Sequence, residues 1–69
     1  MTAMRITLNG RDREVAPGAT VAALLDGLGL APSRLAVERN GRVVPKPDYP
    51  AVALAEGDVV EVVHFVGGG

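Results

Sequence analysis

A single helical stripe is the feature that most limits the folds open to this chain. Its apolar residues recur with the i, i+3, i+4, i+7 spacing of one buried helix face: Val21, Leu24, Leu25 and Leu28. Thr20 is a suitable N-cap, and Gly29 can take the left-handed conformation that often ends a helix. Because one helix can cover only one face of a sheet, the sequence predicts an α+β fold with one main helix packed on one side.

Alternating apolar residues indicate the strands that this helix covers. Met4, Ile6 and Leu8 alternate with polar side chains, which is the period of a half-buried strand. Further strands are predicted over residues 11–15, 35–39 and 43–44, and the longest over residues 59–66. Asn-Gly pairs at 9–10 and 40–41 predict tight hairpin turns. This order favours a β-grasp, in which the first and last strands lie parallel at the centre of a mixed sheet of four to five strands.

Two segments complete the predicted fold. Residues 45–50 contain three prolines and are expected to form a loop, since proline cannot donate to a strand ladder. Val52 and Leu54 are expected to return to the core. A turn over residues 56–58 then leads into the last strand.

Length and composition exclude several classes of protein. Sixty-nine residues allow one small domain, which we expect to be stable by only ~3–10 kcal/mol. The chain has no cysteine and one histidine, so a structural zinc site and an iron–sulfur cluster lack ligands. Without cysteine, the chain also cannot carry a persulfide. Seven basic and eight acidic residues, with two aromatics, argue against a nucleic-acid partner. No signal peptide or membrane span is evident, so we expect a cytoplasmic protein that is monomeric when free.

The chain ends in three glycines directly after the predicted last strand. Gly67, Gly68 and Gly69 carry no side chains, so they can pass through a narrow channel and present the Gly69 carboxylate to another enzyme. We therefore divide the chain into a folded domain over residues 1–66 and a flexible tail over residues 67–69. A frayed terminus or an artificial remnant is the alternative interpretation.

Parity along the last strand predicts a surface beside this tail. If the alternate valines of the strand face the helix, Glu61, Val63 and Phe65 face the other way. Val63 and Phe65 would then form an exposed apolar patch, and such patches tend to mark partner sites. Glu61, Val63 and Phe65 are therefore candidates for partner docking. The alternative is that a loop such as residues 45–54 covers them.

No residue of the chain is predicted to be catalytic. His64 has no Ser, Cys or acid at a spacing that would organise it for catalysis. Glu56 and Asp58 flank a turn glycine, and turn chemistry explains both. Asp26 and Glu38 are interpreted as surface charges, and the glycines do not form a phosphate-binding motif.

Several segments together resemble one known family. They are Asn9-Gly10, the helix start over residues 20–25, residues 36–45, Leu54, residues 57–63 and the three terminal glycines. In these segments the chain resembles the ThiS family, the sulfur carrier proteins of thiamin thiazole biosynthesis, over nearly its whole length. The resemblance implies a ubiquitin-like β-grasp fold. One departure is that residues 45–50 are richer in proline than expected for the family.

The resemblance also implies a mechanism and a set of partners. An adenylating enzyme of the ThiF type would use ATP and Mg to convert the Gly69 carboxylate to an acyl-adenylate. Sulfur from a persulfide, supplied by a cysteine desulfurase or a similar enzyme, would displace AMP and leave a thiocarboxylate. Thiazole synthase of the ThiG type would accept that sulfur. The chain itself would bind no cofactor and would be a protein co-substrate, not an enzyme.

Other interpretations stay open on the sequence alone. A carrier serving molybdopterin synthesis or tRNA thiolation would share the fold and the tail. A ubiquitin-like modifier would use the same adenylate to form isopeptide bonds with lysines. A simple interaction module would carry an idle tail.

Overall fold

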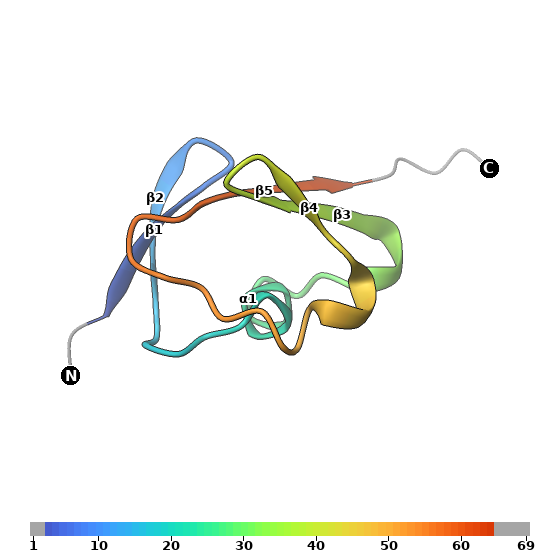
Figure 1. The fold of residues 1–69 in the computed structure, drawn as a ribbon, viewed down its shortest axis with the longest axis horizontal. Coiled ribbons are helices and arrows are strands. Elements are labelled where there is room, and N and C mark those ends of the chain that lie inside the picture. The colour runs from blue at the N-terminus through green and yellow to red at the C-terminus, as the bar shows by residue number, and fades with distance from the viewer. Residues whose placement is uncertain (1–2, 65–69) are drawn as a thin grey trace.

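Within residues 3–64, five strands form one mixed sheet in the order β2-β1-β5-β3-β4 (Figure 1). Their bounds are Met4–Leu8 for β1, Arg11–Val15 for β2, Leu35–Arg39 for β3, Arg42–Val44 for β4 and Val59–His64 for β5. β1 and β5 are parallel, whereas the other neighbouring pairs are antiparallel. The central parallel pair confirms the predicted β-grasp topology.

The structure is a computed structural model, and it describes residues 3–64. The predictions for Phe65 and for residues 67–69 therefore lie outside the described residues.

Both Asn-Gly pairs form the hairpin turns expected of them. Asn9 and Gly10 have φ angles of 49° and 81°, and Asn40 and Gly41 have φ angles of 52° and 82°. Positive φ at both central residues is the geometry of a type I′ turn, whose twist matches that of the flanking strands. The first turn sets the register of β1 and β2, and the second that of β3 and β4.

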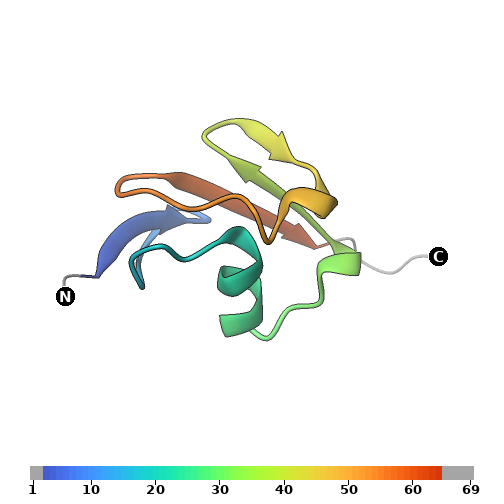
Figure 2. The ribbon, with the colours of Figure 1, turned by 60° about the horizontal axis from the view of Figure 1, so that its bottom comes forward.

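Residues 3–64 contain one α-helix, α1, which spans Val21–Gly27 and lies on one side of the sheet (Figure 2). Thr20 caps its start, because its Oγ1 accepts a backbone hydrogen bond of 3.1 Å from the first turn. Gly29 takes a φ of 73° after its end, and the N–H of Leu30 reaches back to the Leu25 carbonyl at 3.0 Å. The cap and the C-terminal turn were both predicted from the sequence.

The core lies between α1 and the sheet. Its buried members are Ile6, Val21, Leu24, Leu25, Leu35, Val37, Val44, Tyr49, Leu54, Val60 and Val62. Val52 packs against this cluster, so the predicted return of Val52 and Leu54 to the core is confirmed. Tyr49, which the sequence analysis left in a loop, is only 2% exposed.

The segment after β4 differs from the plain loop expected of it. Lys46–Asp48 forms a short 3-10 helix, since proline is tolerated in the first turn of a helix. Another short 3-10 helix, Pro32–Arg34, precedes β3. The carbonyls of Tyr49 and Val52 accept hydrogen bonds of 2.9 and 3.0 Å from backbone N–H groups at the start of α1. This segment therefore lies on the helix side of the sheet.

Candidate functional site

β5 presents two different faces along its length. Val60 is 0% exposed and Val62 8% exposed, whereas Val63 is 52% exposed and Glu61 is also exposed. The predicted parity is thus confirmed for the described part of the strand. We call the side of the sheet opposite α1 the outer face. Because residues 45–54 pack beside α1, the alternative in which they cover Val63 is wrong.

The outer face carries more exposed apolar surface than the sequence analysis expected. Val43 on β4 is 68% exposed and Val59 on β5 is 48% exposed. The strand register places both on the same side as Val63, since Val43 lies opposite Glu38 and Glu38 lies opposite Glu61. Parity within each strand was readable from the sequence. That Val43, Val59 and Val63 share one face could not be predicted from the sequence, because it depends on which strands pair and in what register.

The outer face is also acidic. Its strand residues with charged side chains are Arg5, Asp12, Glu14, Glu38 and Glu61. Arg5 pairs with Glu14 at 3.7 Å on β1 and β2, where both side chains are well exposed. Within residues 3–64 no Lys or Arg forms an ion pair with Glu38 or Glu61. The face therefore combines exposed valines with two neighbouring carboxylates.

A buried carboxylate supports this face from within the fold. Asp58, just before β5, is 6% exposed and accepts hydrogen bonds from Arg39 Nε (2.7 Å), Asn40 Nδ2 (3.0 Å) and the Ala55 N–H (2.8 Å). Burial alone raises the pKa of Asp58, but the bonds from Arg39, Ala55 and Asn40, with the Arg39 charge, outweigh it and hold the pKa below its usual value. Turn chemistry, which the sequence analysis invoked, accounts only for the Ala55 bond.

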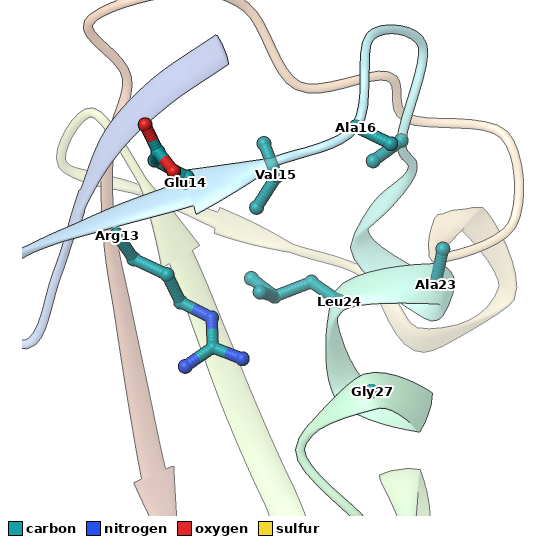
Figure 3. A pocket seen from close by; sticks show the side chains of 8 residues that line it. Arg13, Glu14, Val15, Ala16, Ala23, Leu24 and Gly27 are labelled. Carbon is teal, nitrogen blue, oxygen red and sulfur yellow. The ribbon is translucent and has the colours of Figure 1, made fainter. Parts of the chain in front are cut away.

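A shallow hollow lies between β2 and α1, on the opposite side from the outer face (Figure 3). Its lining residues are Arg13, Glu14, Val15, Ala16, Ala19, Ala23, Leu24 and Gly27. The Arg13 side chain extends from β2 toward the helix (Figure 3). The lining is apolar apart from Arg13 and Glu14, and the Glu14 side chain pairs with Arg5 on the outer face. These residues supply no nucleophile, so we assign this hollow no reaction.

The remaining candidates for chemistry are ordinary parts of the fold. His64 is exposed at the end of β5, and Asp26 is exposed on α1. In the part of the chain that the structure describes, no three His, Cys, Asp or Glu side chains gather closely enough to hold a metal ion. No helix in residues 3–64 is long and apolar enough to cross a membrane.

Comparison with known proteins links this architecture to one family. A model of the ThiS family matches residues 6–69. The chain is 40% identical over 65 residues to the sulfur carrier protein ThiS of Bacillus subtilis, which covers 93% of this chain and 98% of that relative. It is 53% identical over 66 residues to a thiazole synthase of Magnetococcus marinus, covering 96% of this chain. The chain spans only about a fifth of that relative, since the match covers 20% of its length.

Solved structures agree with the fold. The thiamine biosynthesis protein ThiS of Geobacter metallireducens superposes with a TM-score of 0.82 at 36% identity, covering 96% of this chain and all of that one. A designed protein based on human erythrocytic ubiquitin superposes with a TM-score of 0.52 at 21% identity, which bears on the fold alone. These likenesses confirm the predicted ubiquitin-like β-grasp.

Proposed function

This chain belongs to the ThiS family, and from that premise we propose that it is a cytoplasmic sulfur carrier protein of thiamin biosynthesis and not itself an enzyme. The observation that carries the proposal is the family match, which runs through residue 69 and so includes the terminal glycines. The atom that carries sulfur is the carboxyl carbon of Gly69. Gly67 and Gly68 let the tail enter a partner's active site, because a glycine has no Cβ to obstruct a narrow channel.

Activation of Gly69 requires a partner enzyme. The terminal carboxyl group has an unperturbed pKa of about 3.3–3.7, so near neutral pH it is an anion and a poor electrophile. A ThiF-type enzyme removes this obstacle: the carboxylate attacks the α-phosphorus of ATP, pyrophosphate leaves, and an acyl-adenylate forms. ATP and Mg are substrates of that enzyme, and the carrier has no resident cofactor.

Sulfur then replaces the adenylate. A persulfide, loaded by a cysteine desulfurase or a similar donor, attacks the Gly69 carbonyl carbon and expels AMP, and reduction of the resulting acyl disulfide by a thiol releases the thiocarboxylate. A carrier without cysteine cannot divert this persulfide onto itself. The thiocarboxylate next donates its sulfur to thiazole synthase. The relative from Magnetococcus marinus supports that partner, because a protein named thiazole synthase contains a segment 53% identical to this chain.

The outer face is the surface by which we propose that the partner enzymes hold the carrier. Glu61 and Val63 are exposed on β5, directly before the tail. Phe65 lies outside the described residues and is included in the proposal on its place in the sequence alone. Val43 and Val59 extend the apolar area across the sheet. Exposed apolar side chains, beside two carboxylates that have no Lys or Arg ion-pair partner within residues 3–64, fit a partner surface that is apolar and basic.

Intact-mass analysis tests the proposal. The chain is incubated with a ThiF-type enzyme, ATP, Mg, a cysteine desulfurase, cysteine and a reducing thiol. We expect the mass to rise by the difference between sulfur and oxygen, and thiazole synthase to consume the product. A chain lacking Gly69 is the control and should not change. A stable bond to lysines of another protein would instead identify a modifier, and an unchanged mass would contradict the proposal.

A further inference from the structure

The central strand β5 is longer than its parallel neighbour. β1 pairs with β5 at Thr7 opposite Val59 and Leu8 opposite Val60, and β1 then ends. β3 accompanies β5 on its other side as far as His64. From Val62 onward, β5 therefore has a strand on one side only, at the end that leads toward Gly69.

The side chain of Asn9 supplies the missing rung. The Val62 N–H donates to Asn9 Oδ1 at 2.8 Å, and Asn9 Nδ2 donates to the Val62 carbonyl at 3.3 Å. The backbone N–H of Asn9 also donates to the Val60 carbonyl at 2.9 Å. The side-chain amide of Asn9 thus supplies both the acceptor and the donor that backbone groups of a neighbouring strand would offer Val62, just beyond the end of β1.

Asparagine is well suited to this position. Its amide offers both a donor and an acceptor, whereas an aspartate offers only acceptors at neutral pH. It also tolerates the positive φ of 49° that the hairpin turn requires. Turn geometry alone would be met equally well by glycine. The two bonds to Val62 are therefore what glycine could not replace.

The second hairpin turn holds the opposite end of β5. Asn40 Oδ1 accepts the Val59 N–H at 2.9 Å, and the Asn40 N–H donates to the Val59 carbonyl at 2.7 Å. Asn40 Nδ2 also donates to Asp58 at 3.0 Å. The two Asn-Gly turns thus hold the same strand at its start and near its end, and the chain contains its own matched control for Asn9.

We propose that Asn9 is a positioning residue for the reaction at Gly69. Its amide keeps the end of β5 in the sheet, at the point from which the chain continues toward Gly69. Without it, more backbone must be ordered each time the tail enters an active site, and ordering backbone is unfavourable. This inference rests on the proposed function, because it concerns delivery of the same carboxylate.

Two variants of the full chain test this role. Asn9→Gly removes the amide and Asn40→Gly removes its counterpart, and both keep a residue that favours positive φ. Two properties are measured: amide hydrogen exchange at Val62, and kcat and KM for Gly69 adenylation by a ThiF-type enzyme, followed by ATP–pyrophosphate exchange. Amide hydrogen exchange at Val62 reports the Asn9 bonds directly, because it needs no partner enzyme.

We expect Asn9→Gly to speed exchange at Val62 and to lower kcat by roughly two- to tenfold, the factor that corresponds to one net hydrogen bond. KM should stay unchanged, since Glu61 and Val63 are intact. Asn40→Gly should lower thermal stability but leave kcat normal. An Asn9→Gly variant with normal kcat, or an equal loss of kcat in Asn40→Gly, would overturn the positioning role alone. Failure of the unaltered chain to be adenylated would overturn the proposed function as well.

Discussion

Glu38 on β3 and Glu61 on β5 lie directly opposite each other on the outer face. Like charges in directly opposed positions of an antiparallel pair destabilise a sheet. In residues 3–64 neither glutamate has a Lys or Arg ion-pair partner. The helix α1 lies on the other side of the sheet and does not cover them. An arrangement that weakens the free carrier, beside the exposed Val43 and Val63, is understandable if a partner supplies the missing positive charge.

Neutralising this pair should separate stability from recognition. We expect Glu61→Gln to raise the free energy of unfolding by about 0.2–1 kcal/mol, because the repulsion with Glu38 is removed. The same change should raise KM for the ThiF-type enzyme by roughly two- to fivefold, as expected for the loss of one exposed ion pair. Urea denaturation and adenylation kinetics measure the two effects.

Asp26→Asn is the matched control for this charge, since Asp26 is exposed on α1 and away from the outer face. Asp26→Asn should leave KM for the ThiF-type enzyme unchanged at both low and high salt. Equal KM values for Glu61→Gln and the unaltered chain would contradict an electrostatic role of the outer face.

Val63 should contribute to partner binding without contributing to the fold. It is 52% exposed, so Val63→Ser should leave the thermal midpoint nearly unchanged. If Val63 lies in a buried contact with the partner, KM should rise by roughly fivefold or more, which corresponds to about 1 kcal/mol. Val43→Ser, on the edge strand β4, is the comparison and should have the smaller effect. A larger rise in KM for Val43→Ser than for Val63→Ser would contradict a partner contact centred on β5.

Asp58 should make stability depend on acid. Its pKa is lowered in the folded state from the ordinary value of 3.8. Its contribution to stability is therefore fully present above that value and is lost as pH falls through the lower folded pKa. We expect Asp58→Ala to lower the free energy of unfolding by about 2–3 kcal/mol near neutral pH, because Arg39 and Asn40 lose their acceptor.

Urea titrations between about pH 2 and pH 6, a range set by roughly two units either side of an aspartate pKa, measure this dependence. The Asp58→Ala chain should show a flatter profile than the unaltered chain below about pH 4. Two parallel profiles would show that Asp58 is not the group responsible.

A side chain in the tail should block chemistry and leave the fold intact. Gly68→Val is expected to abolish adenylation, because a β-branched side chain would obstruct the channel that admits the tail. Chemical denaturation should give the same midpoint as the unaltered chain. Normal adenylation of Gly68→Val would disprove the steric role of Gly68, while leaving the reaction at Gly69 possible.

The sequence predicted the elements whose causes are local. The two Asn-Gly turns, the Thr20 cap and the apolar stripe of α1 each depend on residues a few positions apart, and all were confirmed. The short 3-10 helix Lys46–Asp48 was missed because three prolines indicated only that a strand was impossible.

What the sequence could not predict depends on contacts between distant residues. The bond between Arg39 and Asp58 joins residues 19 positions apart, and that between Asn9 and Val62 residues 53 apart. The gathering of Val43 with Val59 and Val63 likewise needs the register of three strands. The terminal glycines are the reverse case, because their assignment came from the sequence and lies outside the described residues.

The central claim is that sulfur is carried on the carboxyl group of Gly69. The most direct measurement compares two otherwise identical chains, one ending in a free carboxylate and one in a carboxamide, in a reconstituted system with the adenylating enzyme, the sulfur donor and thiazole synthase. The free chain should exchange one oxygen for sulfur and support thiazole formation, and the amidated chain should do neither. Thiazole formation by the amidated chain would contradict the account.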